Sequence, residues 1–476
     1  MDLLSNTNDI LFTFLGLAPL ILASVLVPVA LRRRERITPL LQCVSNRTYA
    51  FIIAGAFVLM AGVCSLLHFK VDPFGDDDLY FVRALNIIEC GVFGYGQTPI
   101  AYFPPGYSFI LLPAAITFGS SRWAFFLTNM TLLVGISVWT RFVLIRLGIA
   151  SRPANLVSLI IVLYPNRLLS TLTPASDIPF SLVYLCAFLF MTLGILYPER
   201  WRYPLLVGVT AGIASLVRAT GLPLMIPLAA GLWCSNAAPR RLRLRNAGVM
   251  VASMFVVLIP WTVRNALLFG TFAPVSDNFG VNLAIGNNPS NSVTHNRYVD
   301  SVWSDPGAWR AVGGSRWNEA ERDSYLARQG VQYIREHPVR FLYLGGLKVF
   351  HTLASDASSF GTLETCTNAR LLVFSAFPGL PPKSPVLGIL HAVYSTGYRT
   401  LFIVNNTVYY SGIILVLFAL YRHRRRLAGP EVAYLFVALI ACALAFVLFG
   451  LSRYKEPLPP LTVLLVALAA FHPRVQ

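Results

Sequence analysis

Long apolar stretches separated by short polar segments set the pattern of this chain. Most of the apolar runs are about 17–25 residues long, the length that a helix needs to cross roughly 30 Å of hydrocarbon. Inside a bilayer every backbone polar group must be paired within the protein, so we predict that these runs are helices. Eleven spans are predicted, at residues 10–31, 49–68, 121–145, 154–171, 178–196, 204–217, 222–235, 247–263, 400–421, 432–450 and 458–472.

Three further segments are not counted as spans. Segment 106–119 is short and lies between "PPGY" and "GSS", which predicts a helix along the membrane interface. Residues 264–340 are polar and predict an external region, with a helix in 317–338 that Pro338 ends and whose apolar face carries Tyr325, Val331 and Ile334. For 341–358 the pattern leaves a span and an interfacial helix both open.

The composition places the chain among membrane proteins. Hydrophobic residues make up 56% and charged residues 12% of the sequence, with a mean hydropathy of +0.63. Soluble domains have about 45–50% apolar and about 25% charged residues. The predicted fold class is therefore an all-α polytopic membrane protein, a bundle of about eleven transmembrane helices with external interfacial helices and one external loop region.

The net charge of +17 is concentrated in five short Arg-rich segments between spans. Such segments are typical of cytoplasmic loops under the positive-inside rule. Nucleic-acid binding would instead need a contiguous basic face on a folded domain, so no nucleic-acid partner is expected. With these loops inside, the N-terminus lies outside and the C-terminus inside; the segments are 32–36, 141–152, 198–202, 239–245 and 421–426.

Three adjacent carboxylates, in "GDDDLYF", follow the second predicted span on the outer side. A helical pattern resumes at Leu79, which predicts that Asp76–Asp78 stand at a helix N-terminus, where the helix dipole favours the ionised form. Charge at the membrane edge is costly and points to function. A solvated acidic loop remains the plain alternative. A calcium loop would need more oxygen ligands along the chain, and a D-x-D metal site of the nucleotide-sugar type would need a cytosolic α/β domain.

Other polar blocks reach the same outer face in this topology. Among the seven cysteines no C-x-x-C pair occurs, and only Cys90 and Cys366 fall in outer loops, where their positions are compatible with a disulfide. The outer blocks are "YFPPGY" (102–107), "TPASDIP" (173–179), Arg218, "PWTVRN" (260–265), "GVNLAIGNNPS" (280–290) and "RYKEPLPP" (453–460).

An ordered succession of blocks from about residue 70 to 465 resembles the GT-C superfamily of integral-membrane glycosyltransferases. The resemblance is to the protein-mannosyltransferase and aminoarabinose-transferase group, which uses polyprenyl-phosphate sugars. The blocks are "GDDDLYFVRALNIIECGVFGY", "PPGYSFILL", "LYPNRLLSTLTPASDIPFSLVYLCA", "GVTAGIASLVRATGLPLMIP", "PWTVRNALLFGTFAPVSDNFGVNLAIGNNP", "YIREHPVRFLYLGGLKVF" and "RYKEPLPPLTVLL".

The resemblance implies transfer of one sugar from a polyprenyl-phosphate donor to an acceptor hydroxyl on the non-cytoplasmic face. In that family an aspartate of the first outer loop, four residues before a Tyr, is taken as the general base, which here is Asp76 before Tyr80, with Asp77 beside it. A carboxylate suits a base, and Arg suits the leaving phosphate. The candidate phosphate-binding residues are Arg218, Arg264, Arg453, Lys348 and Lys455, and the candidate substrate-binding residues are Tyr80, Tyr102, Tyr107, Asp177 and Asn287.

The expected partners are a polyprenyl-phosphate-linked sugar, a glycan, lipid or protein acceptor, and the bilayer. No metal is required by a monophosphate donor, although a divalent cation is compatible with the site. The expected location is a bacterial inner membrane, with the active site facing the periplasm or the exterior.

Two features depart from the family pattern. The first span is extra, and Ser176-Asp177 stands where relatives often have Ser-Glu. The Trp-Trp-Asp signature of oligosaccharyltransferases is absent, which argues against transfer of a whole glycan to asparagine. Two other functions remain alternatives: a transporter or lipid flippase, which usually shows inverted repeats and ionisable residues at the membrane midplane, and a non-catalytic scaffold.

The predicted organisation has four parts. Residues 1–48 hold the extra span and a basic loop, and 49–263 form the transmembrane core with the first external loop at 69–120. Residues 264–399 form the partly helical external region, and 400–476 hold the last transmembrane helices.

Overall fold

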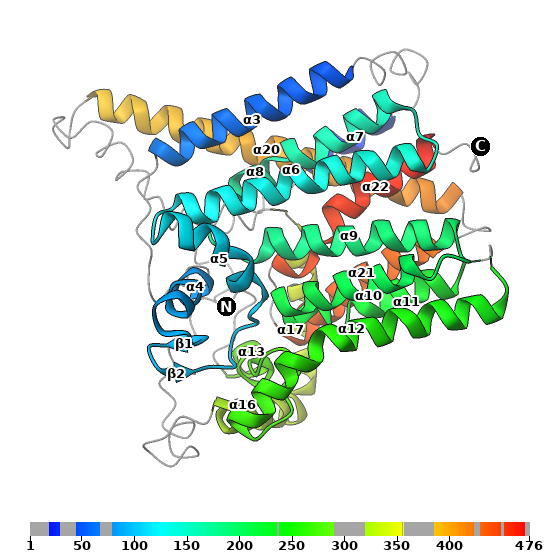
Figure 1. The fold of residues 1–476 in the computed structure, drawn as a ribbon. Coiled ribbons are helices and arrows are strands. Elements are labelled where there is room, and N and C mark those ends of the chain that lie inside the picture. The colour runs from blue at the N-terminus through cyan, green and yellow to red at the C-terminus, as the bar shows by residue number, and fades with distance from the viewer. Residues whose placement is uncertain are drawn as a thin grey trace.

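The computed structural model describes residues 19–28, 44–66, 79–235, 238–289, 319–354, 356, 385–422, 429–448 and 452–471. The described chain is a bundle of helices with one small hairpin, so the predicted all-α membrane fold class is confirmed (Figure 1). The longer helices run side by side, and shorter elements gather at one end of the bundle.

Among the described residues, six helices are long and apolar enough to cross a membrane. Each overlaps one predicted span. They are α3 (Asn46–Leu66), α6 (Trp123–Arg146), α9 (Asp177–Leu196), α12 (Arg240–Phe269), α20 (Pro385–Arg422) and α21 (Gly429–Val447).

The other predicted spans coincide with shorter apolar helices, so the count of eleven stays a prediction. These are the helix at 19–28, α7 (Ser151–Leu163) continued by α8 (Pro165–Ser170), α10 (Arg202–Val217), α11 (Met225–Trp233) after the 3₁₀ turn η2 (Ala219–Gly221), and α22 (Leu458–Phe471).

The remaining elements are short helices and one hairpin. Segment 341–358 belongs largely to α17, which has 17 residues and is not among the candidate spans. The elements are α4 (Leu79–Cys90), β1 (Gly94–Tyr95) paired antiparallel with β2 (Thr98–Pro99), α5 (Gly106–Phe118), α13 (Phe279–Gly286), α16 (Glu319–Glu336), α17 (Pro338–Ala354) and the 3₁₀ turn η3 (Ser452–Lys455).

Basic loops and polar blocks lie at opposite ends of the bundle. Arg245 donates hydrogen bonds to the carbonyl oxygens of Pro198 and Glu199, which places two of the Arg-rich segments side by side. At the other end, Glu319 of α16 accepts hydrogen bonds from the backbone of Ala101 and Tyr102 (Figure 1). This is the separation that the positive-inside pattern predicts for two sides of a membrane.

The centre of the bundle is α9, which is apolar on all sides because it is surrounded by protein. Tyr184 and Phe188 are fully buried, and α10 and α22 pack against this helix. A helix that is hydrophobic all round belongs in a core. Its first residue, Asp177, is thereby fixed at the end of the bundle where the polar blocks gather.

The predicted helix in 317–338 is α16, and it ends before Pro338 as expected. Its apolar face was assigned wrongly in part, because Val331 is 37% exposed. The buried side carries Leu326, Gly330 and Tyr333 instead. The reason is the close packing of α16 on α13, where Gly330 lies against the backbone of Leu283 and Ala284.

We expect Gly106→Ala to destabilise the fold. A Cβ at position 106 would lie 2.7 Å from the backbone of Leu216 and Val217, so α5 could no longer contact the end of α10. Overpacking of this kind costs about 1–3 kcal/mol, and thermal unfolding in detergent measures it. Gly135→Ala in α6 is the matched control, because a Cβ there meets no atom within 4 Å. Equal melting temperatures for the two variants would contradict the prediction.

Candidate functional site

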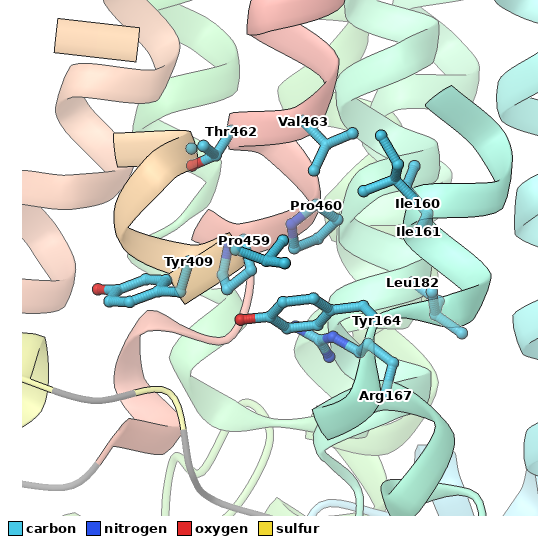
Figure 2. Close-up of a pocket in the computed structure, with 12 residues that line it drawn as sticks. Ile160, Ile161, Tyr164, Arg167, Leu182, Tyr409, Pro459, Pro460, Thr462 and Val463 are labelled. Carbon is cyan, nitrogen blue, oxygen red and sulfur yellow. The ribbon is translucent and has the colours of Figure 1, made fainter. Parts of the chain in front are cut away.

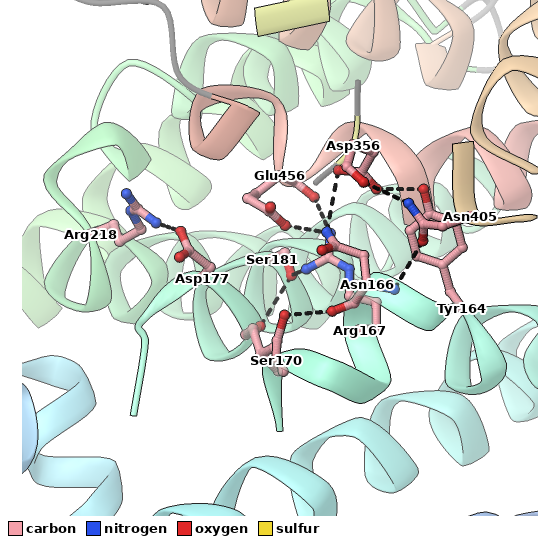
Figure 3. A network of polar contacts seen from close by, with 11 residues as sticks. Tyr164, Asn166, Arg167, Ser170, Asp177, Ser181, Arg218, Asp356, Asn405 and Glu456 are labelled. Atoms are coloured by element: carbon pink, nitrogen blue, oxygen red, sulfur yellow. Dashed lines mark hydrogen bonds and ion pairs between the residues drawn. The ribbon is translucent and has the colours of Figure 1, made fainter. Parts of the chain in front are cut away.

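An ion pair between Asp177 and Arg218 lies where the polar blocks converge (Figure 3). Asp177 opens α9, so the helix dipole stabilises its carboxylate. Arg218 ends α10 in an extended conformation, with φ −146° and ψ 132°, before η2 begins. Both were predicted as site residues, and the structure brings them together. The pair places a carboxylate and a guanidinium side by side at the end of the bundle.

A row of aromatic side chains leads from the start of α4 towards the segment that precedes Asp177. The ring of Tyr80, at the start of α4, lies 5.5 Å from the ring of Phe103 and 5.7 Å from that of Tyr107. The Tyr107 hydroxyl donates to Asn129 Oδ1 at 2.9 Å, and Asn129 Nδ2 donates to the carbonyl of Thr173 at 2.9 Å. We call Tyr80, Phe103 and Tyr107 the aromatic row.

Beyond the aromatic row, the chain continues from Thr173 to Asp177. The predicted substrate-binding residues Tyr80, Tyr107 and Asp177 therefore belong to one connected region. Tyr102 adjoins it, because its ring lies 4.7 Å from the ring of Phe103.

A second, fully buried ion pair was not predicted. Arg167 of α8 pairs with Glu456 at 2.8 Å, and the two side chains are 3% and 1% exposed. The same guanidinium donates to Ser181 Oγ of α9 and to the Glu456 carbonyl, each at 2.5 Å (Figure 3). Burial of two charges is stable only with such additional hydrogen bonds. The pair thus ties α8, α9 and the "RYKEPLPP" block together.

Asp356 is the centre of the same polar cluster. Its carboxylate accepts hydrogen bonds from the Tyr164 hydroxyl and from Asn166 Nδ2 (Figure 3). Its backbone is held by Asn405 and Asn406 of α20, at 2.6 and 2.8 Å. Desolvation raises the pKa of Asp356 and nearby Glu456 raises it further, whereas Lys455, Arg167 and the Tyr164 hydrogen bond oppose the rise.

The two candidate lysines, Lys348 and Lys455, are fully buried. The Lys348 ammonium donates to the Gly286 carbonyl at 2.8 Å, at the C-terminus of α13, and burial lowers its pKa to about 8. The Lys455 ammonium lies 4.1 Å from the centre of the Tyr409 ring. Burial also lowers the pKa of Lys455 to about 8, against the attraction of Asp356 and Glu456. Both lysines occupy structural positions, and a phosphate-binding role for them stays a prediction.

The other candidate residues either donate hydrogen bonds to backbone carbonyls or lie outside the described residues. The Arg264 guanidinium donates to the carbonyls of Ile100 and Phe93, at 2.6 and 3.3 Å. Asn287 donates to the carbonyls of Leu283 and Val447. Asp76, Asp77 and the Arg453 side chain lie outside the described residues, as does Cys366; Cys90 carries a free thiol.

One small apolar cavity lies beside the buried polar cluster (Figure 2). It measures about 30 Å³, with Tyr164 and Arg167 at one end and Ile160, Thr462 and Val463 at the other. Ligand pockets are typically about 300–1,000 Å³. The space suits about one water molecule, so this cavity is a packing void and not a sugar site.

Nothing within the described ranges forms a group of three or more His, Cys, Asp or Glu side chains that could hold a metal ion. The acidic block at 76–78 lies outside those ranges.

Sequence reasoning missed Arg167, Glu456, Asp356 and Tyr164. For two of them the sequence pattern could have indicated a paired or functional charge. Arg167 is a charge inside an apolar run, and Glu456 lies in a polar block between two apolar helices. Asp356 gave no such signal, because it stands among Ser and Ala in a polar stretch.

No family model matches the sequence, and no curated protein matches it. Solved structures do. The chain is similar to the oligosaccharyltransferase of Archaeoglobus fulgidus in its apo form, with 17% identity and a TM-score of 0.49 over 89% of this chain and 50% of that one. The same archaeal enzyme, AglB, in complex with an inhibitory peptide and a dolichol-phosphate gives 17% identity and a TM-score of 0.46, over 88% and 50%.

ArnT from Cupriavidus metallidurans bound to undecaprenyl phosphate gives 14% identity and a TM-score of 0.43, over 88% of this chain and 78% of that one. These proteins are GT-C glycosyltransferases. The chain spans about half the length of the oligosaccharyltransferase. At such identities the similarity concerns the fold alone.

Proposed function

We propose that this protein is a membrane glycosyltransferase that moves a single sugar from a polyprenyl-phosphate donor to an acceptor hydroxyl on the non-cytoplasmic face. The observation that carries the proposal is the Asp177–Arg218 pair, joined through the aromatic row to the helix that directly follows "GDDD". It supports a site at the bundle end opposite the Arg-rich loops. A bacterial inner membrane with a periplasmic site fits this arrangement.

The proposed chemistry divides between two kinds of group. Asp76 takes the proton of the acceptor hydroxyl as it attacks the anomeric carbon, with Asp77 orienting it or binding the acceptor. Negative charge nearby also stabilises the oxocarbenium-like transition state. The bond to the phosphate oxygen breaks, and the polyprenyl phosphate leaves with the electron pair. Arg218 stabilises that phosphate, because a guanidinium has five N–H donors and can bind Asp177 and a phosphate oxygen together.

Arg453, the second residue of η3, is a second candidate for the phosphate. For Arg264 the phosphate role stays a prediction; its guanidinium donates to the carbonyls of Ile100 and Phe93 and to Asn265 Oδ1. A requirement for a divalent cation is tested separately by chelation with EDTA. We expect sugar transfer to persist in the presence of EDTA. One A. fulgidus structure holds zinc and sulfate, and loss of activity in EDTA that Mg²⁺ or Zn²⁺ restores would contradict this expectation.

The reaction itself is tested by comparing cells with and without the gene. Mass spectrometry of the lipid, polysaccharide and glycoprotein fractions should show one species that loses a single sugar when the gene is absent. Purified protein in nanodiscs should then restore that sugar from the polyprenyl-phosphate donor. Loss of a lipid from one leaflet without any change in glycosylation would favour the flippase alternative.

We expect Arg218→Ala to weaken binding of undecaprenyl phosphate. A lost hydrogen bond to a charged group costs roughly 1.5–3 kcal/mol, which is about a tenfold to hundredfold rise in Kd. Arg218→Lys should recover part of the affinity, because an ammonium lacks the planar fork. Binding to purified protein in detergent is the measurement.

The matched control for Arg218 is Arg200→Ala. Arg200 is an exposed residue at the opposite end of the bundle, stacked on the Tyr197 ring, so its removal should leave the affinity unchanged. Equal affinities for Arg218→Ala and Arg200→Ala would remove Arg218 from the proposed phosphate site.

A further inference from the structure

Three residues from the first half of the external region, 264–399, hold one short segment of the first external loop. The Arg264 guanidinium donates to the Ile100 carbonyl at 2.6 Å, and the Asp277 backbone N–H donates to the Ala101 carbonyl at 3.1 Å. Glu319 Oε2 accepts the N–H groups of Ala101 and Tyr102, at 2.7 and 3.1 Å. We call Arg264, Asp277 and Glu319 the clamp.

Glu319 is the member of the clamp whose side chain accepts rather than donates. It bridges 218 residues of sequence, and it opens α16, where the helix dipole favours a carboxylate. Ala101 is fully buried, so loss of this acceptor would leave its N–H without a partner away from water. Glu319 therefore fixes the backbone at the base of the "YFPPGY" block.

The clamped segment leads directly to the proposed site. Tyr102 is followed by Phe103 of the aromatic row, and Tyr107 reaches the Thr173 carbonyl through Asn129. Ser108 also donates to the Tyr80 carbonyl at 2.8 Å, which ties α5 to the start of α4. A shift of Ala101 would thus be transmitted both to the helix behind the acidic block and to the loop before Asp177.

We propose that Glu319 is a positioning residue, which holds Ala101 and Tyr102 so that Phe103 and Tyr107 keep Tyr80 and the Thr173 loop in place for sugar transfer. The effect on transfer rests on the proposed function, whereas the clamp rests on contacts within this chain.

Charged groups around the clamp make it sensitive to pH. Asp277 is buried, and it faces Glu319, Arg322 and Asp323 of α16 and Arg264 of α12. The pKa of Asp277 is raised from 3.8 to about 7: burial is the largest cause and the charges of Glu319 and Asp323 add to it, whereas its own backbone N–H and Arg322 oppose the rise. The pKa of Glu319 is also raised by burial, against the hydrogen bonds from Ala101 and Tyr102 and the charges of Arg322 and Arg83.

The raised pKa of Asp277 determines how the stability of the folded protein changes with pH. Between about pH 4 and 7 the folded protein binds a proton at Asp277 that the unfolded chain releases, so stability falls as the pH rises through this window. Above pH 7 the ionised Asp277 repels Glu319 and Asp323. The clamp should then loosen, and Asp277→Asn, which keeps the backbone N–H, should prevent the loosening.

The test uses the full-length protein in nanodiscs. Hydrogen exchange of the Ala101 and Tyr102 amides should be faster in Glu319→Ala, and the Thr173 loop should exchange faster with them. In the transfer assay kcat should fall by about tenfold or more, since misplacement by 1 Å can cost about a hundredfold. Affinity for undecaprenyl phosphate should stay at the wild-type value, and Glu319→Gln should recover part of kcat, because its amide oxygen still accepts.

The matched control is Glu321→Gln, an exposed carboxylate on the same turn of α16, which should behave as wild type. Unchanged exchange at Ala101 in Glu319→Ala would overturn the clamp. Faster exchange at Ala101 with an unchanged Thr173 loop, or with unchanged kcat, would overturn the positioning role. Absence of transfer activity in the wild-type protein would refute the proposed function but not the clamp. In that case the positioning role would be decided by hydrogen exchange, according to whether the amides of Ala101 and of the Thr173 loop both exchange faster in Glu319→Ala.

Discussion

Asp76→Asn should lower the rate of sugar transfer by about 10²–10⁴-fold, the range for loss of a general base. The amide keeps the shape of the side chain and part of its hydrogen bonding but cannot accept the proton of the attacking hydroxyl. Binding of undecaprenyl phosphate and thermal stability should therefore stay near wild-type values. The measurement is transfer of labelled sugar from the polyprenyl-phosphate donor by purified variants in nanodiscs.

Asp78→Asn is the matched control within the same block, because no role in the reaction is assigned to Asp78, and its effect should be small. Asp77→Asn should fall between the two. If Asp77→Asn is inactive while Asp76→Asn retains turnover, the base is Asp77. The assignment of the base by its spacing from Tyr80 would then be wrong by one residue. If all three variants stay active, the acidic block is a solvated loop and the proposed mechanism fails.

Arg167→Met should destabilise the protein by about 3–5 kcal/mol, the usual effect of removing one partner of a buried ion pair. Glu456 is 1% exposed, so its carboxylate would be left as an uncompensated charge in the bundle. The double variant Arg167→Met/Glu456→Leu should recover much of the stability, because it removes both charges and fills the space with apolar atoms. Thermal unfolding in detergent is the measurement.

The control for the buried pair is Arg200→Met, an exposed arginine at the opposite end of the bundle, which should leave the melting temperature unchanged. A single Arg167→Met variant as stable as wild type would show that the pair is not held in a dry interior. A double variant less stable than the single one would show that Glu456 has other partners which the fold depends on.

The local pattern of apolar and polar residues was enough to predict where most of the helices lie along the chain. The amphipathic stretch after "GDDD" is α4, which begins at Leu79, and the helix before Pro338 is α16. Six predicted spans are long apolar helices. The separation of the Arg-rich loops from the polar blocks was also foreseen, since each helix that crosses a bilayer reverses the side on which the chain emerges.

Pattern was not enough to orient every helix face. Tyr325 and Ile334 lie half-buried against the neighbouring cluster as expected, but Val331 is exposed. Spacing defines an apolar stripe on α16, yet the side on which a neighbour packs depends on Gly330 and Gly280, which let α13 approach closely. That approach is a property of two helices, and one helix alone does not reveal it.

The sequence by itself determined the membrane class, the helical segments and the end of the bundle at which each polar block emerges, because lipid leaves an apolar run no alternative to a helix. Only the tertiary structure decided which charges meet. Arg167 pairs with Glu456, 289 residues away, and Glu319 accepts a hydrogen bond from Ala101, 218 residues away. A buried charge must find a partner within a few ångströms, and that distance is set by the packing of helices far apart in the chain.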